Sequence, residues 1–571
     1  MVSRFKILYL WAIAILCFQA MAPVSAQVRK ATADLVLKNG TVYTMNAGRP
    51  KAQAVAVIDN RIAVVGTDAD VAPFVGPNTR VIDLKGVTVV PGLKESHGHL
   101  LGIGWAKMTI NLVGAKGYAE VIERVKVAVQ KAQPGEWIVG RGWHEEKWTD
   151  KSSLTVRGFM THQDLSKATP NNPVHLTRAD GHAVFTNAKA MALMGITKDT
   201  KAPDGGEIIK DKSGNPTGIF VDNAEDLIKR PPPTSNQTRQ ALELGIQECL
   251  ANGITMFDDA GVPLDTLALY KEYAQQGKLN MRLYAMADGL KAMRALGKPE
   301  IGLGNGFLTI RSVKLAADGA LGSRGAALLE PYRDDPGNSG FFTLAPESVY
   351  TAAKYALENG WQVCTHAIGD RTNRMVLDMY EKAMKEYPYI TDTRFRDEHT
   401  QIVDEADISR FAKLGVIASM QGIHATSDLP WASDRLGEAR VLEGAYVWQR
   451  LLKEGVKIIN GTDAPVEAVS PIASFHASVT RMSPEGMPKG GFSPDQRMSR
   501  EEALRSYTLD AAYGSFHEKD LGSIEVGKLG DFTVLSKDIM TAPEDQLLQT
   551  EVLYTIVDGK VRYEKGKTVL P

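Results

Sequence analysis

The sequence contains only three cysteines among its 571 residues. Cys17 lies in the N-terminal apolar segment, which leaves Cys249 and Cys364 for the rest of the chain. Two cysteines cannot build a disulfide framework, so a fold held together by disulfides is excluded. With 44% hydrophobic residues, the chain has enough apolar side chains for the cores of more than one domain.

The sequence also lacks an excess of charge of either sign. Lysine and arginine together number 66, aspartate and glutamate together number 67, and the net charge is -1. Because nucleic acids and anionic membrane surfaces attract basic proteins, we expect neither as a partner. A small molecule is the expected substrate, and a homodimer is the one assembly that we consider.

A hydrophobic run of membrane-spanning length is missing after the first 26 residues. At the N-terminus, Arg4 and Lys6 precede an apolar stretch from Ile7 to about Ala22, and small residues 24–26 would allow cleavage. This pattern is typical of a signal peptide over residues 1–26. An uncleaved anchor is the alternative, but the apolar run is shorter than the roughly 20 residues that a span needs. We therefore expect a periplasmic or secreted protein with no stable membrane anchor after cleavage.

Short β patterns occupy both ends of the mature chain. Residues 33–37, 54–58 and 61–66 alternate with hairpin-type turns, and residues 531–535 and 552–559 repeat this style. The sequence predicts one small β-sandwich domain built from residues 32–90 and 517–571.

The middle of the chain alternates strand and helix patterns, which is typical of an α/β fold. Eight strand-like runs are predicted, the number that a closed (β/α)8 TIM barrel needs; they are residues 87–90 leading to His97, 253–257, 281–286, 308–315, 362–366, 394–399, 416–420 and 457–461. The barrel is assigned to residues 91–516. The long gap after the first strand is too large for a loop, so we assign residues 115–230 to an inserted, substrate-selecting subdomain.

Metal-binding residue types follow several of these strands. His97 and His99 stand one residue apart after the first strand, and alternate residues of an extended segment point the same way. Lys314, His366, His399 and Asp463 lie at or just past the ends of four other strands. Active-site groups of such barrels come from the strand C-termini. Imidazole nitrogens with one carboxylate suit zinc, and also manganese, iron or nickel, although each histidine alone could be structural.

The order of these residues resembles the amidohydrolase superfamily. Residues 313–319, 419–421 and 461–467 are similar to the YtcJ-like branch, amidohydrolase family 3, and residues 522–532 resemble the closing segment of that family. The resemblance covers residues 33–562. One departure is Glu95, where the family usually has aspartate, and this concerns a residue outside the direct metal ligands.

The resemblance implies a set of metal ligands and a mechanism. His97 and His99 would hold the first metal with Asp463, while His366 and His399 would hold a second metal or position the substrate. Metal-bound hydroxide would attack, with Asp463 as general base. The expected cofactor is zinc, as one or two divalent ions per chain.

Lys314 has two interpretations. In related enzymes a lysine at the fourth strand is carboxylated by CO2 and bridges two metals, which would make Lys314 an N6-carboxylysine. Only a neutral amine reacts with CO2, so burial beside cations favours this state. The alternative is an ion pair between Lys314 and Asp318, four residues later.

Six residues are predicted to contact the substrate. Three come from the insertion and the others follow barrel strands; they are Trp143, Arg178, His182, Asp318, Gln421 and His424. The predicted function is hydrolysis of an amide-type carbon–nitrogen bond, such as an N-acyl, N-formyl or carbamoyl compound. A mononuclear deaminase and an ester or lactone hydrolase are the enzymatic alternatives, and a non-catalytic exported binding protein is the non-enzymatic one.

Overall fold

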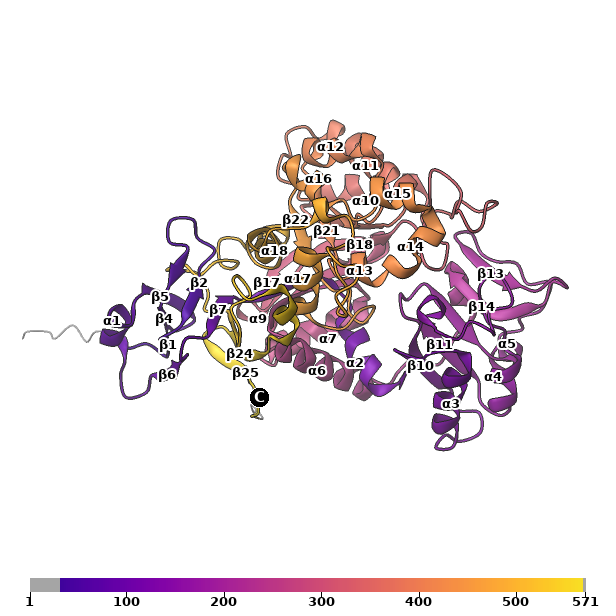
Figure 1. Cartoon of the computed structure of the whole chain (residues 1–571), viewed down its shortest axis with the longest axis horizontal. Coiled ribbons are helices and arrows are strands. Elements are labelled where there is room, and N and C mark those ends of the chain that lie inside the picture. Colours follow the sequence, from indigo (N-terminus) through magenta and orange to yellow (C-terminus); the bar gives the residue numbers. More distant parts are fainter. Residues whose placement is uncertain (1–30, 568–571) are drawn as a thin grey trace, which may run out of the picture.

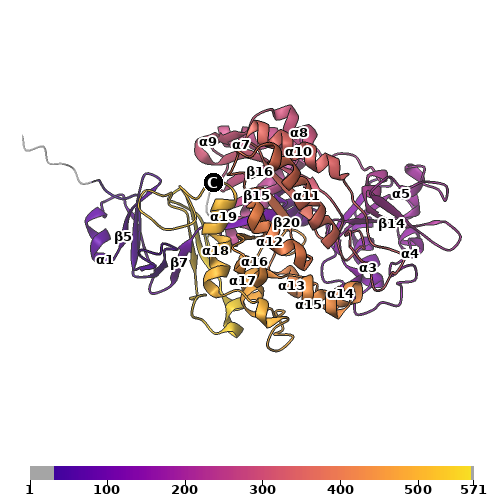
Figure 2. The same ribbon diagram turned by 90° about the horizontal axis from the view of Figure 1, so that it is seen from above.

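The computed structural model describes residues 31–567, so the predicted signal peptide (1–26) lies outside the described residues. Three units lie in a row: a β-sandwich at one end, a barrel in the middle and an inserted subdomain at the other end (Figures 1 and 2). Within this part of the chain, no helix is long and apolar enough to cross a membrane.

Eight parallel strands form the barrel, and seven of them coincide with predicted strand-like runs. The first predicted run, residues 87–90, lies instead in strand β7 (Thr88–Pro91) of the β-sandwich, and the barrel strand follows it directly. In spatial order the barrel strands are β8 (Leu93–Gly98), β15 (Ile254–Val262), β16 (Arg282–Asp288), β18 (Leu308–Ala316), β19 (Gln362–Ala367), β20 (Arg396–His399), β21 (Ile417–Met420) and β22 (Ile458–Asn460). The chain after β22 returns to β8, where the Asp463 amide donates to the His97 carbonyl oxygen at 2.9 Å. The (β/α)8 prediction is confirmed.

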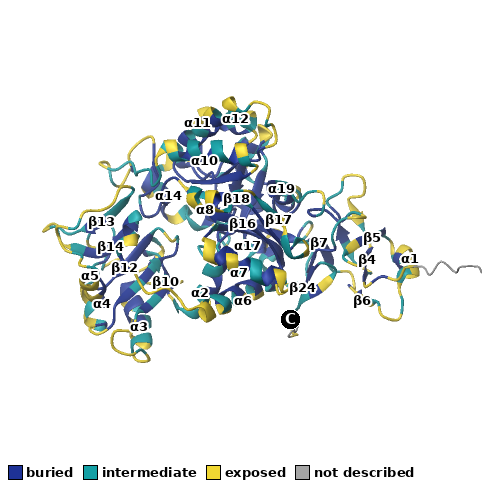
Figure 3. Cartoon of the chain, turned by 180° about the vertical axis from the view of Figure 1, so that it is seen from behind, coloured by how far each residue is buried: buried dark blue, intermediate teal, exposed yellow. Residues whose placement is uncertain are grey.

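Helices cover the outside of the barrel. They include α6 (Ser235–Ala251), α7 (Leu264–Gln275), α8 (Gly289–Leu296), α10 (Pro346–Asn359), α11 (Asp370–Glu386) and α12 (Glu405–Leu414). In α11, buried residues Val376, Leu377, Tyr380 and Ala383 recur at helical spacing and form the face toward the strands. The outer helix faces are exposed, whereas β16 and β18 are buried (Figure 3). This packing fixes the strand ends that carry the predicted site.

A close helix contact lies where the chain leaves β8. A Cβ atom on Gly104 of α2 (Leu100–Met108) would lie 1.9 Å from the Ala241 carbonyl oxygen in α6. We expect Gly104→Ala to lower the free energy of unfolding by about 1–3 kcal/mol, because the helices must separate. Urea denaturation would measure this loss. Gly337→Ala is the control, since no atom lies within 4 Å of its added Cβ; an equal loss in both variants would contradict the explanation.

The β-sandwich domain combines the two chain ends. One sheet has the order β5-β4-β1-β6 and the other β25-β24-β23-β7-β2-β3; their bounds are β1 (Leu35–Lys38), β2 (Thr41–Tyr43), β3 (Lys51–Ala52), β4 (Ala54–Ile58), β5 (Arg61–Gly66), β6 (Arg80–Asp83), β7 (Thr88–Pro91), β23 (Phe532–Leu535), β24 (Val552–Val557) and β25 (Lys560–Glu564). The N-terminal β7 and C-terminal β23 pair antiparallel, with Val89 opposite Val534. Apolar side chains from both segments share one core.

The insertion after the first barrel strand has its own sheet and core. The sheet order is β13-β14-β12-β11-β10-β9, formed by β9 (Ile110–Asn111), β10 (Ile138–Trp143), β11 (Val174–Arg178), β12 (Ala183–Thr186), β13 (Gly206–Lys210) and β14 (Pro216–Asp222). Strand β9 lies before residue 115, where the predicted insertion begins, because it pairs in parallel with β10. Ion pairs such as Arg157 with Asp335, at 2.9 Å, join this subdomain to barrel loops.

Candidate active site

The carboxyl ends of β8, β18, β19 and β20, with the segment after β22, bring six side chains together. His97 Nε2 and His99 Nε2 lie 3.7 and 3.2 Å from Asp463 Oδ1. One ligand atom from each of these three residues lies within 4.8 Å of the others. This separation lets one ion contact all three groups.

The other predicted ligands continue the cluster. Ring centroids of His97 and His399 are 4.8 Å apart, and those of His399 and His366 are 4.5 Å apart. Lys314 Nζ lies 3.0 Å from His97 Nε2. Asp318 instead accepts hydrogen bonds from backbone amides, including that of Gly369 at 2.9 Å. The alternative ion pair between Lys314 and Asp318 is therefore not the arrangement found.

Hydrogen bonds at Nδ1 orient three of the histidines. His97 Nδ1 contacts Glu398, His99 Nδ1 lies 3.1 Å from the Ala260 carbonyl oxygen, and His399 Nδ1 lies 2.8 Å from Gln421 Oε1. Engaging Nδ1 leaves Nε2 free to face the cluster. Metal-binding histidines typically have such a partner on the other ring nitrogen.

His366 provides a direct test of whether these residues fit a metal. Its Nε2 is buried and makes no hydrogen bond with any described residue. The nearest carboxylate, Asp318 Oδ1, lies 3.4 Å away. A buried imidazole nitrogen without a partner is costly unless a ligand satisfies it. Together with the nitrogen and carboxylate donors around it, this atom fits a divalent metal such as zinc.

The electrostatics of the cluster also suit a cation. Burial and the nearby Lys314 lower the pKa of His97 to about 4, and burial holds the pKa values of His366 and His399 well below their usual range. Burial alone would raise the pKa of Asp463, but His99 and the neighbouring histidines hold it well below its usual range. At neutral pH the cluster thus offers neutral imidazoles and an ionised carboxylate, the forms that bind metal.

The backbone at two of these residues is strained. His399 has φ of 80° and Asp463 has φ of 55°, in the left-handed region that side-chain-bearing residues rarely adopt. Strained residues of this kind concentrate at active sites and ligand clamps. Nearby, Gly461 permits the close approach of β8, because a Cβ there would lie 2.3 Å from Glu95 Oε1. Glu95 itself accepts from the Thr462 amide at 2.7 Å, so it braces the loop that carries Asp463.

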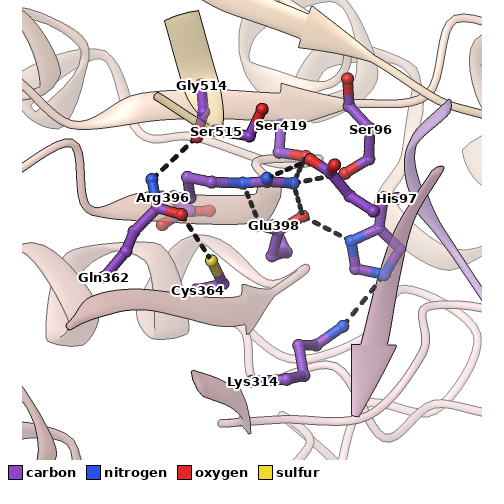
Figure 4. A network of polar contacts seen from close by, with 12 residues as sticks. Ser96, His97, Lys314, Gln362, Cys364, Arg396, Glu398, Ser419, Gly514 and Ser515 are labelled. Atoms are coloured by element: carbon purple, nitrogen blue, oxygen red, sulfur yellow. Dashed lines mark hydrogen bonds and ion pairs between the residues drawn. The ribbon is translucent and has the colours of Figure 1, made fainter. Parts of the chain in front are cut away.

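A buried ionic network lies below the cluster inside the barrel (Figure 4). Glu398 contacts His97 Nδ1 and pairs with Arg396, whose Nε lies 2.6 Å from Glu398 Oε1. Arg396 Nη1 also donates to Asp258 at 2.8 Å, and Asp258 pairs with Lys94. None of these contacts was predicted from the sequence. The sequence feature that could have indicated this network is the pair of charged residues, Arg396 and Glu398, at alternate positions of a strand predicted to be buried.

Glu398 should control metal affinity through His97. We expect Glu398→Gln to weaken zinc binding by about 10- to 100-fold, since the histidine loses a charged partner that raises its basicity. Competition with a chromogenic chelator would measure the dissociation constant. The exposed Glu454→Gln serves as the control. Unchanged zinc affinity in Glu398→Gln would show that the contact does not orient the ligand.

A pocket opens above the cluster between the barrel and the insertion. About 540 Å³ of space, open solvent included, is free of protein atoms there. The insertion contributes His144, Lys147, Arg178, Ala179, Asp180 and His182, and the barrel side contributes Ala320, Leu321, Gly322, His366, Ile368, His399, Gln401, His424, Asp428, Trp431, Asp463, Val466 and Glu467. His144, Lys147, Trp431 and Glu467 were not singled out from the sequence, since three separate segments supply them.

Three of the predicted substrate contacts lie in this wall and three do not. Arg178, His182 and His424 line the pocket, so their contact with substrate stays a prediction. The prediction is wrong for Trp143, which is fully buried in the insertion core and donates to the Leu176 carbonyl oxygen at 2.8 Å.

Asp318 and Gln421 likewise lie outside the pocket lining. Asp318 is fully buried and binds backbone amides, and Gln421 holds His399. In this structure both residues hold other parts of the site in place, and their contact with substrate stays a prediction.

His182 is carried by the insertion to the edge of the metal cluster. Its Nδ1 lies 2.6 Å from Asp222 Oδ1, and its ring centroid lies 5.1 Å from that of His366. Burial opposes a charge on His182, but Asp222 outweighs this and raises the pKa of the imidazole to about 9. The barrel segment after β18 accommodates Asp222 closely, because a Cβ on Gly325 would lie 2.1 Å from Asp222 Oδ2.

Comparisons with known proteins agree with this geometry. The model of the amidohydrolase family matches residues 80–563. The putative amidohydrolase YtcJ of Bacillus subtilis (strain 168) is 31% identical over 543 residues, which cover 92% of this chain and 99% of that protein. The N-substituted formamide deformylase of Arthrobacter pascens is 30% identical over 559 residues, covering 93% of this chain and 98% of that protein.

A solved structure is similar over nearly its whole length. The uncharacterized metal-dependent hydrolase from Pyrococcus horikoshii OT3 has a TM-score of 0.71 at 27% identity, with 89% of this chain and 99% of that chain covered. The protein therefore belongs to the amidohydrolase family and is a metal-dependent hydrolase acting on carbon–nitrogen bonds.

Proposed function

We propose that this protein is an exported zinc-dependent enzyme that hydrolyses an amide-type bond, N-acyl or N-formyl, of a small molecule. The observation that carries the proposal is the ionised Asp463, which lies 3.2 Å from His99 and 3.7 Å from His97 on the pocket floor. A carboxylate beside two imidazoles combines metal binding with proton transfer at one point. The relative from Arthrobacter pascens, named an N-substituted formamide deformylase, supports an amide-type substrate.

Different residues of the site would bind the metal, transfer the proton and position the substrate. A divalent ion, when bound, supplies a Lewis acid and lowers the pKa of water. His97, His99 and Asp463 would hold that ion, and His366 and His399 would hold a second. Asp463 Oδ1 faces the histidines, so Oδ2 is the atom that takes the proton of the attacking water and passes it to the leaving nitrogen. His182, fixed by Asp222, would orient the substrate beside His366.

Lys314 decides between one metal and two. Its Nζ lies 3.0 Å from His97 Nε2, so a carboxylated Lys314 would be one of the groups that hold the metal ions. Burial lowers the pKa of Lys314, which favours the neutral amine that reacts with CO2. These observations support N6-carboxylysine and a two-metal centre. A mononuclear deaminase is the alternative, and it would not need the lysine as a bridge.

A substrate panel that identifies every product tests the proposed reaction. Zinc-loaded protein would be offered amides, amidines, esters and lactones, with released amine, ammonia, carboxylate and alcohol measured separately. Equal amounts of amine and carboxylate from an amide are expected. Ammonia from a carbon–nitrogen double bond would favour the deaminase, alcohol would favour the ester hydrolase, and no product from any class would contradict the proposal.

Export is a separate part of the proposal and has its own test. The N-terminal pattern of Arg4, Lys6 and an apolar stretch supports cleavage before Gln27. N-terminal sequencing of protein from the periplasmic or secreted fraction should begin at Gln27. A chain that keeps residues 1–26 and stays with the cytoplasmic fraction would contradict export.

A further inference from the structure

We propose that the pocket selects amides whose substituent carries no charge, and that the Lys147–Glu467 ion pair excludes substrates bearing a carboxylate. This inference rests on the proposed amide hydrolysis and adds a substrate class to it. Its basis is that both cationic side chains of the pocket wall contributed by arginine and lysine, Arg178 and Lys147, are paired with carboxylates of the protein itself.

Arg178 illustrates the pairing. Its side chain is fully buried, and Nε and Nη2 donate to the two carboxylate oxygens of Glu145 at 2.9 and 2.8 Å. Nη1 donates to Asp180. Two carboxylates thus surround one guanidinium, so this arginine has no positive charge left for a substrate carboxylate. A buried ion pair of this kind is costly to break, because it leaves an uncompensated charge.

The other charged groups of the wall are also engaged. His182 is held by Asp222, and Asp428 Oδ2 accepts from the Tyr446 hydroxyl at 2.8 Å and from Gln401 Nε2 at 3.1 Å. Among the described pocket-lining residues, the only lysine or arginine side chains are those of Arg178 and Lys147. Since Arg178 is already paired, Lys147 is the one that a substrate anion could approach.

Lys147 is neutralised across the pocket. Its Nζ lies 3.3 Å from Glu467 Oε1, which joins the insertion to the segment after β22. The side chains are 39% and 20% exposed, so the pair lies at the solvent-facing part of the wall. A substrate carboxylate that approached Lys147 would also approach Glu467, and like charges at such a distance repel.

The remaining wall offers apolar surface. Leu321, Ile368, Trp431 and Val466 line the pocket between these paired charges. Apolar surfaces bind neutral groups through loss of water contact, and an unpaired charge placed against them would lose its hydration without compensation. An uncharged, apolar N-substituent can therefore pack against the apolar side chains without disturbing the ion pairs of the pocket wall.

The test compares two chromogenic substrates that differ by one carboxylate. We would use N-acyl-4-nitroaniline and the corresponding 5-acylamino-2-nitrobenzoate, each in formyl and acetyl form, with the zinc-loaded mature enzyme. The kcat/KM of the neutral amide should exceed that of the carboxylate by at least about tenfold. Non-productive binding of the carboxylate to the metal does not affect this comparison, because it lowers kcat and KM together.

Variants of the ion pair separate its role from general damage. Glu467→Gln leaves Lys147 unpaired. The kcat/KM of the neutral amide divided by that of the carboxylate-bearing amide should therefore fall at least about fivefold. The ratio cancels any loss common to both substrates. Adding Lys147→Met to Glu467→Gln removes the cation and should restore the preference for the neutral amide.

The outcomes distinguish this inference from the proposed function. Equal kcat/KM for both substrates, or a ratio that does not change in Glu467→Gln, would overturn the inference while leaving amide hydrolysis intact. A positively charged trimethylanilinium amide that is hydrolysed faster than the neutral one would overturn it as well. Failure to hydrolyse any of these amides would contradict the proposed function, and the inference would fall with it.

Discussion

Asp463→Asn is expected to lower kcat by about 10²- to 10⁴-fold, the usual contribution of a positioned acid–base group. Asparagine has the same shape but cannot accept the proton of the attacking water. It also removes the negative charge that faces His97 and His99 at 3.7 and 3.2 Å. Steady-state kinetics on the best amide of the substrate panel would measure the loss.

The control for this variant is Asp199→Asn, an exposed site on the insertion. Thermal unfolding of both variants in metal-free form should remain close to that of the unchanged metal-free protein, because neither substitution changes the size of a side chain. If Asp463→Asn kept a rate within threefold of the unchanged enzyme, Asp463 would not be the general base.

Lys314→Met should reduce the bound metal from two ions per chain to one. A methionine side chain keeps most of the volume of lysine but cannot form a carbamate with CO2. Loss of one Lewis acid removes several kcal/mol of transition-state stabilisation, so kcat should fall by at least about 100-fold. Elemental analysis and kinetics on the same sample would test both effects.

The comparison for this variant is Lys189→Met, on the exposed surface of the insertion. If Lys314→Met kept full metal and full activity, the bridging role would be wrong and Lys314 would be structural. Loss of the second metal with full activity would instead indicate a mononuclear enzyme.

The barrel was predictable because its strands carry their own signals. Short runs such as residues 362–366 end in a polar residue and are followed by a helical pattern. Seven of the eight expected runs are barrel strands, and residues 87–90 lie in β7 of the β-sandwich. The insertion was harder to delimit. Strand β9 has only two residues, and its pairing with β10 depends on a contact across an intervening helix, α3 (Tyr118–Val129). A local pattern does not contain this information.

The metal cluster was predictable for a related reason. Parallel strands place their carboxyl ends at one mouth, so residues far apart in sequence, such as His97 and His399, must converge there. The pocket wall follows no such rule. Trp143 and Trp431 are both aromatic, yet only Trp431 lines the pocket, because the register of β10 turns Trp143 into the insertion core.

Glu398 shows a further limit of sequence analysis. It precedes the predicted ligand His399, but its partner is His97 on another strand. Only the closed barrel brings these two side chains together, and only then does the role of Arg396 as a counter-charge become visible (Figure 4). Buried charges in barrel strands are therefore useful signals, although their partners have to come from the structure.

We propose that a metal held by His97, His99 and Asp463 makes this protein an amide hydrolase. The most direct test is amine release from an amide by metal-stripped protein as zinc is returned in measured equivalents. We expect no activity without metal and a rise to a plateau at one or two equivalents per chain. Full activity in the stripped protein, or none at any zinc level, would contradict this proposal.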